Sequence, residues 1–207
     1  AASADNAIKR MCDIFAALFG IILLTPLWII VAAMVRLNDG GPAFFTQERV
    51  GLDGKTFTMF KFRTMRVDAE ELKDSLMEAN EADSSAGNSI MFKMANDPRI
   101  TRIGAFLRKT SIDELPQLFN VLRGDMSLVG PRPPLPSEVA QYEPRVMDKF
   151  AVRPGITGLW QISGRSNLSW DETVHLDLSY AQHRSLTLDT WIMLQTIPAL
   201  LRHEGAY

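Results

Sequence analysis

The sequence contains a single cysteine, Cys12, in 207 residues. An internal disulfide framework is therefore excluded, and the composition is typical of a protein in a reducing cytoplasm. Because Cys12 adjoins an apolar run, we expect it to be a small buried side chain. A chain of this length can bury one core without disulfides or a structural metal.

A strong charge of either sign is also missing. The 22 basic and 24 acidic residues leave a formal net charge of −2. This balance provides no global attraction to nucleic acid, and we expect no nucleic-acid partner. Basic residues do cluster locally beside polar segments, which indicates an anionic ligand. These residues are Lys61, Arg63, Arg66, Arg99, Arg102, Arg108 and Lys109.

Several familiar site motifs are absent. The chain has no G-x-x-x-x-G-K-[ST] loop, no G-x-G-x-x-G fingerprint and no G-x-S-x-G elbow, so a classical nucleotide-binding fold or a serine hydrolase is disfavoured. The histidines His175, His183 and His203 have no metal-ligand spacing. We expect them to be surface or interface residues.

One long apolar run stands near the N-terminus. Residues 14–35 include no charged side chain. As a straight helix they would extend about 33 Å, just enough to cross a bilayer core. A signal peptide is disfavoured by the length of the run and the lack of a clear cleavage site. A buried core helix is the soluble alternative.

Two features of this run argue against a simple membrane span. Pro26, preceded by Thr25, lies in its middle and removes a backbone hydrogen bond. Basic residues flank both ends, with Lys9 and Arg10 before it and Arg36 after it, so the positive-inside rule assigns no direction. We therefore predict a re-entrant helix that breaks at Thr25-Pro26 and returns to the cytoplasmic side.

The remaining sequence predicts an α+β fold, mostly helical with a small β-hairpin. Residues 1–37 form the membrane-inserted part, and residues 38–207 form a cytosolic catalytic domain at the membrane interface. Turn residues at 38–42 end the apolar helix, and two β-like runs follow. The predicted strands are 43–50 and 55–62; the predicted helices include 101–109 with Thr101 as cap, 111–123 with Gly124 as stop, and the interfacial amphipathic stretches 170–183 and 188–203.

Asp113 and Glu114 are adjacent carboxylates at the start of a predicted helix. Their structural interpretation is a capping box, because Ser111 and Glu114 have the required spacing. Their functional interpretation rests on nearby arginines, Arg108 before the pair and Arg132 after it. Carboxylates and arginines beside a helix start suit a phosphate bridged by Mg²⁺. The pattern alone leaves both interpretations open.

Three blocks resemble a known family. They are KFRTM at 61–65, DELPQLFNVLRGDMSLVGPRP at 113–133 and RPGITGLWQISGR at 153–165. Together they resemble the bacterial sugar transferases, the monotopic polyprenyl-phosphate phosphoglycosyl transferases, from about Lys9 to the C-terminus. The resemblance is to the larger members, which carry further transmembrane helices upstream. We therefore expect the chain to be the catalytic portion of a longer protein.

The resemblance implies transfer of sugar-1-phosphate from a UDP-sugar to undecaprenyl phosphate, releasing UMP. It further implies Mg²⁺, the lipid bilayer as a partner and an active site on the cytoplasmic face of the bacterial inner membrane, with a homo-oligomer as a further partner. Asp113 would be the nucleophile, and Glu114 with Asp113 would bind the metal. The implied phosphate and substrate residues are Lys61, Arg63, Arg108, Arg132, Arg153 and Arg165.

The chain departs from the family pattern at one point, and the resemblance leaves the sugar and two alternative functions open. The family often has Ser-Pro at the membrane break, where this chain has Thr25-Pro26; a threonine hydroxyl can make the same hydrogen bond to the helix backbone. The transferred sugar is undetermined among glucose, galactose and N-acetylhexosamine phosphates. The alternative functions are a lipid-phosphate hydrolase and a non-catalytic, membrane-anchored nucleotide-binding module.

Overall fold

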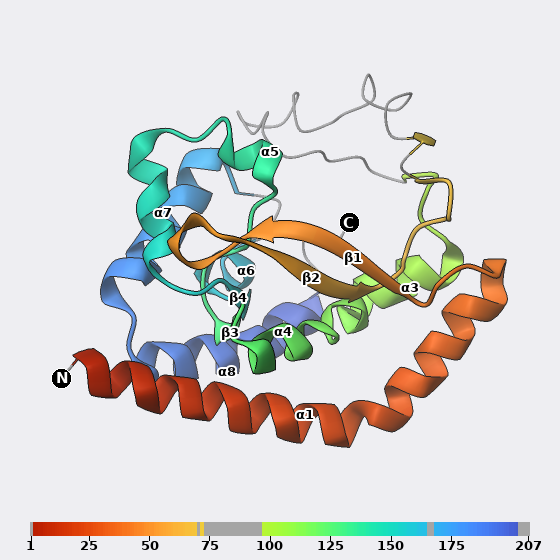
Figure 1. Ribbon diagram of the computed structural model, residues 1–207, viewed down its shortest axis with the longest axis horizontal. Helices are drawn as coiled ribbons and strands as arrows, with labels where there is room; N and C mark the ends of the chain where they lie inside the picture. Colours follow the sequence, from red (N-terminus) through yellow and green to blue (C-terminus); the bar gives the residue numbers. More distant parts are fainter. Residues whose placement is uncertain (1, 70, 73–96, 165–167, 203–207) are drawn as a thin grey trace.

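The computed structural model describes residues 2–69, 71–72, 97–164 and 168–202. These form a mostly helical protein with two small two-stranded sheets (Figure 1). The elements are α1 (Ala2–Asp39), β1 (Phe44–Val50), η1 (Leu52–Gly54), β2 (Thr56–Phe62), α3 (Arg102–Thr110), η4 (Ile112–Glu114), α4 (Gln117–Arg123), β3 (Ser127–Val129), α5 (Pro136–Val139), η5 (Pro144–Ala151), β4 (Gly155–Thr157), α6 (Leu159–Ile162), α7 (Trp170–His183) and α8 (Leu186–Arg202).

Helix α1 is bent rather than broken at Pro26. Its 38 residues are helical throughout, and Figure 1 shows it running along one side of the molecule before turning toward the hairpin. The predicted break is therefore wrong. The expected threonine hydrogen bond is confirmed, since the Thr25 hydroxyl donates to the Ile21 carbonyl at 2.7 Å. Such a bond beside a proline bends a helix while its backbone stays helical.

The apolar part of α1 is mostly exposed. By length and composition the helix could cross a membrane, and only 17% of its most apolar window is buried. Phe15, Phe19 and Ile22 each expose about two thirds of their surface. A core helix of a soluble protein would be mostly buried, so that alternative is disfavoured. Cys12, predicted to be buried, is exposed instead, because it lies on the open side of α1.

The main core lies between α1, the hairpin and α4. The hairpin was predicted and is confirmed: β1 and β2 pair antiparallel, with Phe44 opposite Phe62. Trp28 of α1 contacts both Phe62 and Phe119 of α4. The fully buried Asn120 side chain holds the edge of β2, accepting from the Phe60 N–H and donating to the Thr58 carbonyl. The middle of α4 is thereby fixed against the hairpin.

The second sheet joins two of the sequence blocks. Strands β3 and β4 pair in parallel, an arrangement that the sequence did not predict. Gly130 and Gly155 cross with almost no space between their backbones; a Cβ on Gly155 would lie 2.0 Å from the Gly130 nitrogen. Only glycine permits this approach. The crossing brings the loop containing Arg132 against the loop containing Arg153.

Helix α8 presents an apolar outer side. Trp191, Leu194 and Ile197 are exposed, and Leu194 leaves 61% of its surface uncovered. An ion pair between Lys9 and Asp189 links α8 to the first turns of α1. Two helices with exposed apolar side chains are therefore joined to each other by a charged contact.

Candidate active site

The adjacent carboxylates lie on the short turn η4 between α3 and α4. Ser111 ends α3 in the left-handed conformation, with φ at 56°, and its side chain makes no capping bond. The predicted capping box is therefore wrong, because a helix N-cap requires an extended backbone. The predicted single helix 111–123 is also wrong: a 3₁₀ turn precedes α4, which follows Pro116. The predicted stop at Gly124 is confirmed by its φ of 93°.

Asp113 is almost completely enclosed on this turn, with only 7% of its surface exposed. Burial raises the pKa of the Asp113 carboxyl to about 6, and the negative charge of Glu114 adds to the increase. Lys61 and Arg108 oppose the shift by attracting the ionised form. Asp113 is thus a desolvated carboxylate between two cations. Binding of a further cation beside it, or a reaction that neutralises its charge, would be favourable.

Lys61 reaches the pair from β2. Its Nζ donates to Glu114 Oε1 at 2.7 Å. About a third of the Glu114 side chain is exposed, so this carboxylate lies at the mouth of the site while Asp113 lies deeper. Strand geometry explains the placement, because Lys61 is on the opposite hairpin face from Phe62, which packs in the core.

Arg108 is fixed beside Asp113 by a close helix contact. Its Nε donates to Thr64 Oγ1 at 2.9 Å, and burial lowers the pKa of its guanidinium although Asp113 attracts the charge. Helix α3 can approach Thr64 because Gly104 has no side chain: a Cβ there would lie 1.8 Å from the Thr64 carbonyl oxygen. Thr101 caps α3 as predicted, accepting from the Gly104 N–H.

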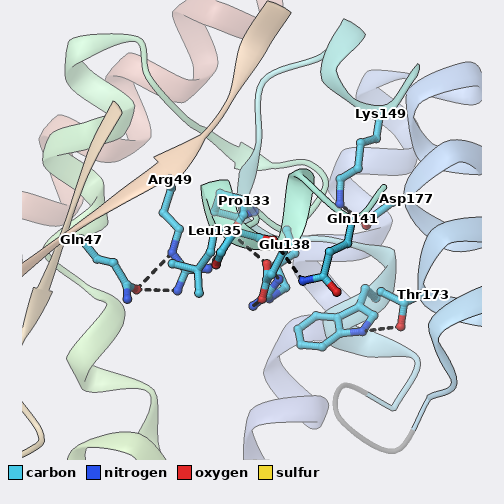
Figure 2. A network of polar contacts seen from close by, with 12 residues as sticks. Gln47, Arg49, Pro133, Leu135, Glu138, Gln141, Lys149, Thr173 and Asp177 are labelled. Carbon is cyan, nitrogen blue, oxygen red and sulfur yellow. Dashed lines mark hydrogen bonds and ion pairs between the residues drawn. The ribbon is translucent and has the colours of Figure 1, made fainter. Parts of the chain in front are cut away.

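A second pair of cations lies nearby. Arg132 donates to both carboxylate oxygens of Glu138, at 2.9 and 3.1 Å. Arg49 of β1 donates to the Pro133 carbonyl at 2.9 Å and to Gln47, as Figure 2 shows. Burial and the charge of Arg132 lower the pKa of Arg49 to about 10. Glu114 also acts on Arg49 electrostatically. The pair Arg49 and Arg132 therefore lies in the same region as Lys61 and Arg108.

The sequence interpretation missed Arg49. A signal for it was available, since it lies in a predicted strand on the same face as Gln47 and Lys61. A cation on that face must either reach solvent or pair within the fold. The structure shows that it extends along the loop that follows Arg132.

The Arg132–Glu138 pair leads to a prediction about stability. Burial raises the pKa of Glu138, but Arg132 and the Leu135 N–H lower it by more. The net pKa therefore lies below the ordinary value of 4.5. Stabilisation from a lowered carboxyl pKa is present above pH 4.5 and is lost as the pH falls through the folded-state pKa. We expect Glu138→Gln to destabilise the fold by about 3 kcal/mol at pH 7, because Arg132 loses its buried partner.

Thermal unfolding between pH 3 and pH 7 measures this effect. The difference in Tm between the natural protein and Glu138→Gln should shrink below about pH 4.5. Glu143→Gln is the matched control, since the Glu143 side chain is 69% exposed. An unchanged Tm for Glu138→Gln at pH 7 would contradict the assigned pairing.

Two predicted substrate residues have contacts elsewhere. Arg63 is buried and donates to both Asp39 oxygens, at 2.5 and 2.6 Å, and to the Pro42 carbonyl. It thereby ties the end of α1 to the hairpin. Arg153 donates through Nε to the Gly124 carbonyl at 2.8 Å. In the described part of the chain the structure does not bring either one into contact with Asp113 or Glu114. Arg165 lies outside the described residues.

The carboxylate pair can be tested as a magnesium site. Among the described residues no group of three or more His, Cys, Asp or Glu could form an all-protein metal cage. Mg²⁺ commonly binds through one or two carboxylates and completes its shell with substrate phosphates and water. Asp113 and Glu114 fit that donor set, and the raised pKa of Asp113 indicates a charge that a cation would compensate. His175 and His183 are exposed as predicted; His203 lies outside the described residues.

Almost the whole chain is similar to known proteins. A family model described as bacterial sugar transferase matches residues 4–203. The galactosyl transferase CpsE of Streptococcus agalactiae is 48% identical over 96% of this chain and 43% of its own length. The undecaprenyl-phosphate galactose phosphotransferase of Salmonella typhimurium is 44% identical over 97% of this chain and 42% of its own length. The exopolysaccharide production protein ExoY of Rhizobium meliloti is 42% identical over 96% of this chain and 88% of its own length. The chain thus spans less than half of the first two relatives.

Proposed function

The chain belongs to the bacterial sugar transferase family, and on that premise we propose that it transfers sugar-1-phosphate from a UDP-sugar to undecaprenyl phosphate, releasing UMP. The observation that carries the proposal is the buried Asp113 beside Glu114, with Lys61 and Arg108 around them. The reaction handles two highly charged phosphate substrates, which a cluster of cations around one carboxylate pair suits.

Asp113 is proposed as the nucleophile. The lipid phosphate has a second pKa near 6 and is largely ionised at neutral pH, so the acceptor needs no general base. The Asp113 carboxylate would attack the phosphorus that bears the sugar; its new O–P bond forms as the bond to UMP breaks, and UMP leaves with the electron pair. A lipid phosphate oxygen would then attack the same phosphorus and release the carboxylate.

The neighbouring residues have supporting roles in this proposal. Lys61 and Arg108 would hold the phosphoryl oxygens, and Arg132 with Arg49 would hold the nucleotide phosphate. Glu114 and Asp113 would bind Mg²⁺, which would supply neutralisation of the diphosphate charge. Only 7% of the Asp113 surface is exposed, so little water would reach its carboxylate.

The exposed apolar surface of α1 supports placement in the cytoplasmic membrane, with the active site on its cytoplasmic face. We propose that the bend at Pro26 returns α1 to the side from which it enters, so the site lies where a lipid phosphate and a soluble UDP-sugar can meet. The outer side of α8 would lie on the same interface.

This topology yields a prediction for tagged protein. Tags at residues 1 and 207 should both be accessible to protease in inside-out vesicles. Pro26→Ala should straighten α1 and shift molecules toward a spanning form, with the N-terminal tag protected. Pro42→Ala is the control, because Pro42 follows the helix. Protection of the N-terminal tag in the unmodified protein would contradict re-entry.

The reaction itself is tested with a donor panel. Two of the relatives carry galactose or galactosyl in their names, so UDP-galactose is the first donor to try, against UDP-glucose and UDP-N-acetylhexosamines. The purified chain should convert one donor and undecaprenyl phosphate to a lipid-diphosphate sugar and UMP in equal amounts. Release of sugar phosphate without lipid would indicate the hydrolase alternative, and no turnover with any donor would favour a binding module.

A further inference from the structure

A small polar cavity lies at the first turns of α1, apart from the carboxylate pair. Its volume is about 30 Å³, and its lining includes Lys9, Arg10 and Asp13 from one face of α1, with Arg153 and Arg184 from the catalytic domain. That volume exceeds the roughly 10–15 Å³ that one water molecule requires, so a single small polar group fits. It is far below the roughly 300 Å³ of the smallest typical small-molecule sites, so a whole nucleotide would not fit.

The cavity has more positive than negative charge. Lys9 is paired with Asp189. Asp13 accepts hydrogen bonds from Ser127 Oγ at 2.8 Å and from the Leu128 N–H at 3.1 Å. Arg10 and Arg153 donate to uncharged carbonyls at the end of α4. Apart from the paired Lys9, the lining therefore contains three arginines and one carboxylate, Asp13, and Asp125 also attracts the charge of Arg10.

Exposed apolar side chains lie on the part of α1 that lines the cavity. Ile8 and Met11 lie on the same turns of α1 and leave 48% and 56% of their surfaces uncovered. We propose above that α1 enters the membrane from the cytoplasmic side, and a basic cavity beside such a helix is suited to the headgroup of an anionic lipid. Arginine matches the oxygens of a phosphate group with paired donors.

We propose that this cavity binds the headgroup phosphate of an anionic phospholipid. The proposal rests on the membrane association proposed above, but it does not rest on the transfer reaction. Arg184 would be the outermost contact, because it is exposed. Arg10 and Arg153 also hold the carboxyl end of α4, the helix that follows the Asp113–Glu114 turn. A bound lipid would therefore stabilise the helix that supports the catalytic turn.

The full chain in neutral detergent allows a direct test. Dioleoyl phosphatidylglycerol should raise the Tm and remain bound in native mass spectrometry, whereas dioleoyl phosphatidylcholine and inorganic phosphate should do neither. Arg184→Ala should weaken phosphatidylglycerol binding about fivefold, Arg184→Glu should weaken it further, and Arg184→Lys should preserve it. Arg145→Glu is the matched control, since Arg145 is exposed on η5, and it should bind like the natural protein.

Three results would overturn the proposal: equal binding of the two phospholipids, binding that Arg184→Glu leaves unchanged, or stabilisation by inorganic phosphate as large as that by phosphatidylglycerol. Exchange of UMP into UDP-sugar, measured in detergent without phospholipid, separates this proposal from the proposed function. Arg184 variants should keep that exchange. Phosphatidylglycerol binding without any exchange would overturn the transfer mechanism alone.

Discussion

Replacing Asp113 with asparagine should reduce sugar-phosphate transfer by roughly 10⁴-fold or more, the size of effect seen when an enzyme loses its nucleophile. An amide oxygen is a poor nucleophile and carries no charge to attract a metal. The fold should survive, because asparagine has nearly the same shape. Burial already raises the pKa of Asp113 to about 6, so its ionised form is costly to the folded state. The Tm of the variant should therefore be equal to or above that of the natural protein.

The matched control for this variant is Asp148→Asn. Asp148 is exposed on η5, and the same chemical change there should leave turnover unaltered. The rates are measured with saturating UDP-sugar and undecaprenyl phosphate. Retention of more than about a tenth of the natural rate by Asp113→Asn would exclude a covalent role for this residue.

Removal of divalent cations should abolish turnover, and added Mg²⁺ should restore it. The phosphate charges of the donor would otherwise face the two carboxylates without compensation. Glu114→Gln should lower turnover by roughly 10²-fold or more, because it removes a proposed metal ligand. It should also raise the Mg²⁺ concentration needed for half-maximal rate. Titration of Mg²⁺ into EDTA-treated protein measures both effects.

Glu48→Gln is the control for the metal experiment, since Glu48 is an exposed carboxylate on β1. Its Mg²⁺ dependence should match that of the natural protein. Full turnover in EDTA would remove Glu114 from its proposed role and leave its contact with Lys61 as a structural ion pair.

The elements predicted correctly from the sequence are those with strong local signals. Thr101 caps a helix and Gly124 ends one because each residue type satisfies the backbone there directly. The hairpin follows from glycine-rich turn residues between two β-like runs. Strands β3 and β4 were missed because three-residue strands in a loop with prolines and glycines leave no periodic pattern.

The site was only partly predictable for a related reason. Ser111 adopts the left-handed conformation where α3 ends, and the spacing of Ser111 and Glu114 does not reveal this. Arg63 and Arg153 lie in two of the sequence blocks that carry the family resemblance, yet their donors reach Asp39 and the end of α4. Arginines with structural and phosphate-binding roles have the same appearance in a sequence, and only tertiary contacts separate them.

In the mechanism that we propose, Asp113 forms a covalent bond to the sugar phosphate before any lipid is present. The most direct measurement is exchange of labelled UMP into UDP-sugar without undecaprenyl phosphate. We predict exchange in the natural protein and none in Asp113→Asn, because the first half-reaction is reversible and needs only the carboxylate, the donor and the metal. Absence of exchange in a preparation that transfers sugar phosphate to the lipid would contradict the covalent mechanism.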